Sequence, residues 1–571
     1  MTTLLLLVLL GPAGLAAVSL PFRRAAWTRW TPVAAAVVVL GSGVALVAGA
    51  HDAAVTALGG LLRADSLAAY LVCVVGAVAL TATWGGIRPR ATPDGWFSTL
   101  LCSFLATMVL ALVADNLGVM WVALEATTIT TAFLVGYGGG KRSLEAAWKY
   151  VVLGSVGVAI ALLGIVLLYA ATSAAGHPTL SWVELRTMGS VLDPDLTRLG
   201  VALAALGFAT KAGLAPMHSW LPDAHSQAPS PVSALMSGVL LAVAFAGILR
   251  VKAISDAVLG ESMMRGLLIA AGLLSLLVAA LLLLTQRDYK RMLAYSSIEH
   301  MGIIAIGGAI GGPLAIGAVL LHILGHGLAK ATLFVVAGRM LAFTGTSRID
   351  DVSGLLGRAP KLAVPFLMGS AALLGFPPFG LFFSELAIIV AGWQAGLTWV
   401  VTAMVALLLL VFAGLGRHIL AMTLTRHRGG EALLTDGYAG LLAAAGEVAE
   451  GAEAGKGAEP GKGAEPGKGA EAVEGAEAVE GAEAGKGAEA VKGAEAGKGA
   501  EAVKGAEAGE LAPDEPTHTG FVTNAHHGSP DGPMAPLWLA LTAVAVSGLL
   551  AWPLLGVLTD AVASLIPGAG R

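Results

Sequence analysis

The segment 205-ALGFATKAGLAPMHSWLPDAHSQAPSP-231 places Lys211 inside a run that otherwise has the composition of the middle of a membrane helix. An ionisable group at bilayer depth costs at least about 2.5–3.5 kcal/mol unless it finds a partner, water or a protein-lined cavity. Lys211 is therefore a candidate functional residue. The Gly and Pro residues that follow it interrupt helical hydrogen bonding, so we expect this span to be broken near mid-membrane.

The rest of the chain has the composition of a polytopic membrane protein. Its 571 residues are 56% hydrophobic and only 13% charged. Apolar runs of about 20 residues, the length needed to cross a bilayer, recur between charged or Gly/Pro-rich breaks. We predict an all-α protein with about fourteen transmembrane helices. The net charge of -4 provides no basic face for nucleic acid, and Cys73 and Cys102 are too few for a thiolate metal cluster.

Basic residues in the short loops predict the orientation of the chain. Lys and Arg are more numerous in the odd-numbered loops, which should therefore be cytoplasmic. These loops carry Arg23, Arg24, Arg29, Arg88, Arg90, Lys141, Arg142, Arg287, Lys290, Arg291, Arg348, Arg358 and Lys361. The even-numbered loops carry mainly Arg63, Arg186, Arg198, Arg250, Lys252 and Arg265. With an even number of spans, both termini should lie on the non-cytoplasmic side.

A low-complexity insert separates the last two predicted spans. Residues 451–510 repeat hexads such as GAEAGK and GAEAVE about ten times. This composition buries too little apolar surface to offset the entropy of ordering, so we expect a disordered cytoplasmic loop. Its histidines, His518, His526 and His527, are expected to be solvated. We divide the chain into N-terminal transmembrane helices (1–90), a core (91–425), this loop (426–535) and a C-terminal transmembrane helix (536–571).

Further ionisable residues lie inside predicted spans. They are Glu125, Glu299, His300, His322, His326, Lys330 and Glu385. Because His322, His326 and Lys330 recur every four residues, they should lie on one helix face. Imidazoles titrate near neutral pH and carry two ring nitrogens, so such a row suits proton transfer. The alternative is that these groups only pair across helix contacts; the number of intramembrane titratable positions favours the relay.

The chain also contains a weak internal repeat. GFATKAGLAP (207–216) and GSAALLGFPP (369–378) share the pattern Gly-x5-Gly-x2-Pro, and each lies within an apolar span. Both spans should therefore be broken. Two broken spans in corresponding halves indicate a transporter built from two inverted repeats, here of five helices each, with the ion site at the breaks.

Four segments resemble a known family. They are EATTITTAFLVGYGGGKRSLEAAWKYVVLGS (125–155), GFATKAGLAPMHSWLPDAHSQAPSPVSALMSG (207–238), RDYKRMLAYSSIEHMG (287–302) and HILGHGLAKATLF (322–334). They are similar to the proton-translocating, antiporter-like membrane subunits of respiratory complex I, Mrp antiporters and energy-converting hydrogenases. The resemblance covers roughly residues 65–425 and is strongest to component F of hydrogenase-4 and the formate hydrogenlyase type.

The resemblance implies roles for individual residues. Glu125 would pair with Lys211, and Glu385 would be the terminal group of the second half. The other carriers implied are the central axis His300, His322, His326 and Lys330, with His218, Asp223 and His225 as auxiliary residues. One departure is Ala242, which stands where complex I subunits often carry a Lys in the eighth span, so the two halves must be bridged by water or another residue. The tail also lacks a long amphipathic helix.

The predicted function is proton translocation within a multi-subunit redox complex in the cytoplasmic (inner) membrane. A charge on Lys211 is disfavoured by low dielectric and favoured by Glu125, so the pair can act as a switch. The sequence carries no dinucleotide, flavin or iron-sulphur motif, and GGGKRS fails the phosphate-loop pattern because Arg142 follows Lys141. Without a cofactor, the chain would depend on other membrane subunits and a peripheral electron-transfer arm. A Mrp-type sodium/proton antiporter subunit remains an alternative, and a structural scaffold is the third.

Overall fold

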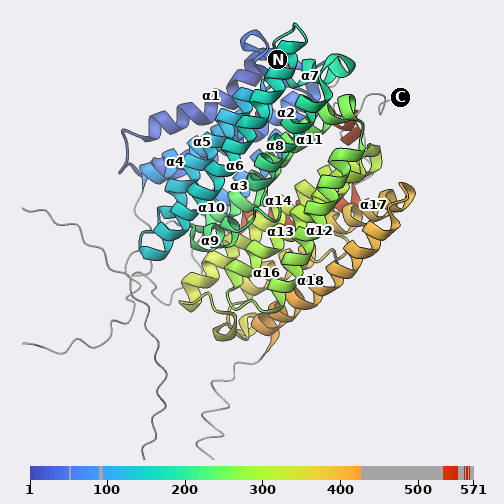
Figure 1. Cartoon of the computed structure of the whole chain (residues 1–571). Coiled ribbons are helices and arrows are strands. Elements are labelled where there is room, and N and C mark those ends of the chain that lie inside the picture. The colour runs from blue at the N-terminus through green and yellow to red at the C-terminus, as the bar shows by residue number, and fades with distance from the viewer. Residues whose placement is uncertain are drawn as a thin grey trace, which may run out of the picture. The chain divides into compact units, whose positions relative to one another are not determined.

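The described part of the chain is built almost entirely of helices, as the sequence predicts (Figure 1). The computed structural model describes residues 1–49, 53–88, 94–425, 532–550, 558–559, 561–563 and 565. The predicted disordered loop, except for its last residues, and part of the predicted C-terminal span lie outside the described residues.

Four long helices form the N-terminal part of the bundle. They are α1 (Thr2–Ser19), α2 (Thr31–Gly49), α3 (Ser66–Gly85) and α4 (Gly95–Val113), with the short 3-10 helix η1 (Ala26–Trp30) before α2. A small hairpin that the sequence analysis did not predict lies between α2 and α3. Its strands β1 (Val55–Ala57) and β2 (Leu62–Ala64) pair antiparallel around the turn η2 (Leu58–Gly60).

The first half of the core contains the first broken span. Its helices are α5 (Leu117–Gly136), α6 (Lys141–Ala174), α7 (Trp182–Met188), α8 (Pro194–Lys211), α9 (Trp220–Gln227), α10 (Ser230–Leu235) and α11 (Leu241–Leu259), with the one-turn elements η3 (Gly189–Val191) and η4 (Met236–Leu240). The chain leaves helical geometry between α8 and α9, directly after Lys211. Gly213 in this break has φ +72°, a left-handed conformation that glycine adopts without a steric penalty.

The second half repeats this plan. Its helices are α12 (Ser262–Leu284), α13 (Tyr289–Ile310), α14 (Gly312–Thr344), η5 (Ile349–Asp351), α15 (Leu355–Arg358), α16 (Pro360–Leu373), α17 (Gly380–Gln394) and α18 (Thr398–Leu424); α20 (Ala535–Leu549) follows the insert. The break between α16 and α17 contains Gly375, the residue that aligns with Gly213 in the internal repeat, with φ +65°. Both predicted broken spans are therefore confirmed, whereas the inverted relation of the halves stays a prediction.

The number of membrane crossings can be compared with the predicted fourteen. The described residues hold eleven helices that are long and apolar enough to cross a membrane, and three shorter apolar helices, Pro360–Leu373, Gly380–Gln394 and Ala535–Leu549. The breaks produce some of the short pieces, since α16 and α17 together make one interrupted span. A count of fourteen stays a prediction.

Helix α14 lies at the centre of the second half and is almost completely surrounded by protein. It packs against α3, α13, α16, α17 and α20. In the first half, α8 lies along α6. A Cβ added to Gly207 would lie 2.4 Å from the carbonyl oxygen of Gly157, so a small residue is needed for this close approach, as is common between membrane helices. This contact fixes the helix that ends at Lys211.

One detail of the loop assignment is wrong. Arg250 and Lys252, which the sequence analysis placed in a loop, lie within α11, and both are buried. The Arg250 guanidinium donates to the backbone carbonyls of Ala114, at 2.6 Å, and Leu112. Hydropathy assigns a cation to a loop, because it takes no account of hydrogen bonds from other helices. Here the free carbonyls at the end of a neighbouring helix accept the hydrogen bonds of the buried guanidinium.

Candidate functional site

Lys211 is the last residue of α8 and is fully buried. Its ammonium donates to the Thr128 hydroxyl on α5 at 2.8 Å and to the Tyr150 hydroxyl on α6 at 2.6 Å. The same nitrogen lies 4.6 Å from the centre of the Tyr150 ring, within the range of a cation–π interaction. Lys211 is thus held by uncharged oxygens and an aromatic face.

Glu125 on α5 lies beside this site and is linked to it through a hydroxyl group. One carboxylate oxygen accepts a hydrogen bond from Ser155 at 2.7 Å, and the other accepts from Thr128 at 3.3 Å. Thr128 therefore contacts both Lys211 and Glu125. Glu125 and Lys211 are therefore linked through the Thr128 hydroxyl and not by a direct ion pair. The two charges still interact electrostatically, over a longer distance than in a direct pair.

The second half also contains a fully buried lysine, Lys330, which lies inside α14 and not in the broken span. Its ammonium donates to the carbonyl of Leu293 at 2.7 Å and to the Ser296 hydroxyl, both on α13. Glu299, one turn further along α13, interacts electrostatically with Lys330. Each half thus contains a buried lysine with a hydroxyl partner and a carboxylate nearby.

The three buried histidines of the predicted axis come together between α13 and α14. The His300 ring lies between the other two, with ring centres 5.1 Å from His322 and 5.0 Å from His326. His300 Nδ1 and His322 Nε2 are 3.0 Å apart, and His322 Nδ1 lies 2.9 Å from the Ser384 hydroxyl on α17. The predicted row on α14 is therefore completed by a ring from the neighbouring helix.

Glu385, at the start of α17, closes this cluster. One nitrogen each of His300 and His322 and a carboxylate oxygen of Glu385 all lie within 4.8 Å of one another. Two imidazoles and a carboxylate at this spacing can share a proton, and the same donor set is also found around zinc. Gly375 of the second break faces the carboxylate, since a Cβ there would lie 2.6 Å from Glu385 Oε2.

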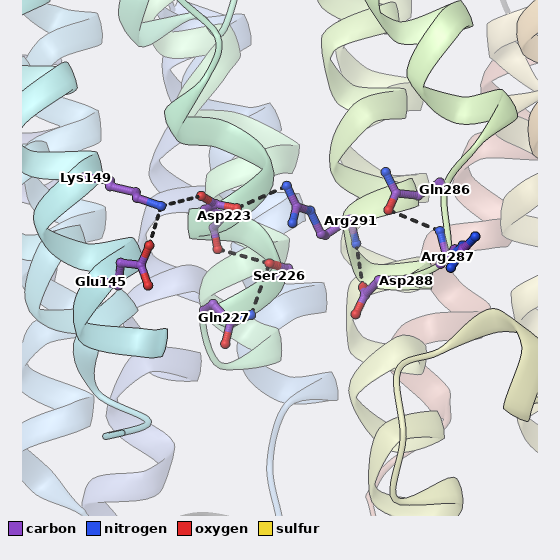
Figure 2. Close-up of polar contacts among 9 residues, drawn as sticks. All are labelled: Glu145, Lys149, Asp223, Ser226, Gln227, Gln286, Arg287, Asp288 and Arg291. Atoms are coloured by element: carbon purple, nitrogen blue, oxygen red, sulfur yellow. Dashed lines mark hydrogen bonds and ion pairs between the residues drawn. The ribbon is translucent and has the colours of Figure 1, made fainter. Parts of the chain in front are cut away.

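Asp223, one of the auxiliary candidates, belongs to a separate network of charges. Figure 2 shows its carboxylate between Lys149 on α6, at 3.4 Å, and Arg291 on α13, at 3.2 Å. Lys149 also pairs with Glu145 at 2.5 Å. These side chains are partly exposed, so each pair contributes little to stability. The network connects the two halves through α9 but does not contact the buried lysines.

The other two auxiliary candidates differ in their surroundings. His218 lies in the first break and is half-buried. His225 on α9 is fully buried; within the described residues its ring interacts with the backbone carbonyl of Leu221 but makes no hydrogen bond of good geometry. Its ring packs between Trp220 and Phe334, with ring centres 5.9 Å away on each side.

The uncharged members of the site are not among the residues predicted from the sequence. They are Thr128, Tyr150, Ser155, Ser296 and Ser384. A hydroxyl in an apolar helix is a weak signal, because most Ser and Thr side chains in membrane helices bond to their own backbone. Only the spacing of Thr128 from Glu125, one turn along α5, could have indicated a shared role.

Comparisons with known proteins identify the family to which the chain belongs. Residues 114–410 match the family described as NADH:quinone oxidoreductase/Mrp antiporter, TM. A hydrogenase-4 component F homolog from Methylacidiphilum infernorum is 42% identical over 297 residues, which are 52% of this chain and 62% of that protein. The chain therefore spans less than two thirds of the length of this relative.

Two solved structures share the fold. An archaeal membrane-bound sulfane sulfur reductase complex contains a chain that is 25% identical, with a TM-score of 0.67 and coverage of 74% of this chain and 87% of that one. A chain of the Mrp complex from Dietzia sp. DQ12-45-1b is 19% identical, with a TM-score of 0.74 and coverage of 100% and 99%. The family match covers all the buried charges described above. This multi-pass integral membrane protein belongs to the NADH:quinone oxidoreductase/Mrp antiporter transmembrane family.

Proposed function

We propose that this chain is a proton-translocating membrane subunit of a multi-subunit redox complex of the energy-converting hydrogenase or NADH:quinone oxidoreductase type. The single observation that carries the proposal is the pair of fully buried lysines, one in each half, with a carboxylate close by. Keeping a buried lysine charged without a direct counter-ion costs free energy. The cost favours the neutral amine, so such a lysine can release its proton as well as bind it.

In the first half, Lys211 would carry the proton and Glu125 would control it. The Thr128 and Tyr150 hydroxyls solvate the ammonium, while the negative charge of Glu125 stabilises it through Thr128. If Glu125 is neutralised or displaced, that stabilisation is lost and the ammonium releases its proton. The protonation state of Lys211 would then depend on the charge and position of Glu125.

In the second half, the proton would pass from Lys330 along the histidines to Glu385. His326, His300 and His322 supply rings at contact distance, and the Ser384 hydroxyl lies next to His322. A neutral imidazole can accept a proton at one nitrogen and release one from the other. The cluster of His300, His322 and Glu385 would be the end of this row.

Other subunits would supply the driving force, because the groups proposed here move protons and the proposed role couples this movement to electron transfer in the complex. The relative from Methylacidiphilum is named as a hydrogenase-4 component, which supports a hydrogenase-type parent complex. We place the chain in the cytoplasmic membrane, in contact with other membrane subunits and a peripheral electron-transfer arm. The loop charges favour non-cytoplasmic termini.

The test is to measure proton uptake and electron transfer together in vesicles that contain the complex purified through a tag on this chain. Lys211→Ala or Lys330→Ala should reduce proton uptake by about a hundredfold or more, while electron transfer either continues uncoupled or stops because coupling is tight. Lys252→Ala is the matched control, since Lys252 is also buried and pairs with Asp256 outside the relay. A Lys211→Ala complex that pumps at the wild-type proton-to-electron ratio would refute the proposal.

A further inference from the structure

The two buried lysines do not share a hydrogen-bond partner in the described part of the chain. Lys211 is bound by side chains of α5 and α6, whereas Lys330 is bound by α13. Ala242 in α11 is buried and apolar, so position 242 contributes no ionisable side chain. A proton moving between the halves therefore needs another titratable group.

His225 lies on the direct route between the two sites. A row of rings leads from one half to the other: Tyr150 packs on Trp220 with centres 4.9 Å apart, Trp220 packs on His225, and His225 packs on Phe334. Tyr150 is the hydroxyl partner of Lys211. Phe334 follows Lys330 by four residues on α14, so it lies on the same helix face.

The imidazole of His225 is buried, and its hydrogen bonding within the described residues is incomplete. Neither ring nitrogen makes a hydrogen bond of good geometry there, although the ring interacts with the backbone carbonyl of Leu221, one turn earlier on α9. The nearby Ser233 hydroxyl bonds to the backbone carbonyl of His225 at 2.7 Å, not to the ring. Because buried polar atoms of folded proteins are nearly always satisfied by protein or by water, the ring nitrogen that does not face Leu221 is placed to bind internal water.

Charges face His225 from two neighbouring helices. Lys330 and His326 on α14 and Lys290 on α13 interact with it electrostatically. All three are cationic when protonated, so positive charge on His225 and on Lys330 at the same time is unfavourable. This repulsion favours states in which only one of the two groups is protonated.

We infer that His225 is the proton carrier that connects the two halves of this chain, in place of a lysine at position 242. The inference rests on the proposed function, since a bridge has a role only if protons move through both halves. It assigns the central step to α9, the short helix after the first break. In each transfer, one imidazole nitrogen accepts a proton through water while the other releases one.

The first test replaces the ring by an amide of similar polarity. His225→Gln should leave the complex assembled and reduce proton uptake by at least about tenfold, because an amide cannot accept a proton near neutral pH. His418→Gln is the matched control: His418 is a buried histidine whose Nε2 contacts the backbone carbonyl of Leu283 at 3.1 Å, outside the relay. Adding Ala242→Lys to His225→Gln should restore part of the uptake, which a purely structural role of His225 would not allow.

A second measurement needs no variant. Hydroxyl-radical labelling of the intact complex, which modifies buried side chains only next to bound water, should label Trp220 although it is only 1% exposed. Wild-type uptake by His225→Gln, or an unlabelled Trp220, would overturn the inference. If Lys211→Ala abolishes uptake and His225→Gln does not, the bridge alone is refuted; if neither variant changes uptake, the proposed function falls as well.

Discussion

Lys211 shows how a charge is held inside the bundle without a direct counter-ion. Placing a lysine at the centre of a membrane helix costs about 2.5–3.5 kcal/mol, and each hydrogen bond to a charged group returns about 1.5–3 kcal/mol. The free energy of the two hydrogen bonds from Lys211 to hydroxyl groups is thus similar in magnitude to the free-energy cost of inserting the charge. Because the balance is close, the more distant charge of Glu125 can decide the protonation state.

Thr128 links the Glu125 carboxylate to the Lys211 ammonium, so removal of its hydroxyl should change how Glu125 affects Lys211. Thr128→Val keeps the shape of the side chain but removes the hydroxyl that contacts both Lys211 and Glu125. Loss of about 1.5–3 kcal/mol, the value of a hydrogen bond to a charged group, should slow proton uptake roughly ten- to a hundredfold. Uptake by vesicles containing the complex measures this effect.

Thr130→Val is the control for this substitution. The Thr130 hydroxyl donates only to carbonyls of its own helix, those of Ala126 at 2.9 Å and Thr127 at 3.1 Å. It should therefore leave uptake unchanged. If Thr128→Val also pumps at the wild-type rate, Glu125 acts on Lys211 through space and not through the hydroxyl.

The two broken helices place the ends of their segments next to functional groups. In the first break, the helix ends at Lys211 and turns at Gly213; in the second, the turn at Gly375 faces Glu385. Both glycines adopt positive φ, a conformation that costs other residues roughly 1–2 kcal/mol. The breaks therefore fix both the backbone path and the space available to the ionisable groups.

Gly375→Ala should displace the Glu385 carboxylate, because the new Cβ would lie 2.6 Å from Oε2. We expect slower proton uptake together with a lower thermal unfolding temperature. Gly396→Ala separates the two effects, since Gly396 has φ +75° and nothing within 4 Å of an added Cβ. It should lower the unfolding temperature by a similar amount without changing uptake. Equal uptake by the two variants would show that the position of Glu385 is not critical.

The described helices of the bundle enclose the proposed relay. Helices α13 and α14, which carry the histidine cluster, are almost fully buried by their neighbours. The segment that leads into α20 is anchored by Arg339 on α14, which donates to the carbonyls of Gly85 at 2.6 Å and Pro533 at 2.9 Å. This anchor fixes the start of α20 independently of the sequence of the insert.

Deletion of residues 451–510 should therefore leave assembly and proton uptake nearly unchanged. The cost of closing a flexible loop changes by only about 0.6 kcal/mol when its length is halved. The yield of intact complex and its proton-to-electron ratio are the measurements. Arg339→Gln, which removes the anchor, should instead reduce the yield. Loss of assembly in the deletion variant would assign the hexad repeat a structural role.

The class of protein, the position of most spans, both broken helices and the charged residues and histidines of the proposed site could all be predicted from the sequence. These features are local: a run of apolar residues specifies a membrane helix, Gly and Pro break it, and a charge within it is conspicuous. The segments around Lys211 and His326 also sufficed to indicate the family.

Which of these groups contact one another depends on the packing of the helices and could not be predicted from the sequence. The packing places Thr128 between Lys211 and Glu125, sets the His300 ring between His322 and His326, and buries His225 between aromatic rings of α9 and α14. Contacts of this kind depend on how helices distant in the chain are rotated and packed against one another, and hydropathy carries no information on rotation for a helix that protein surrounds on every side.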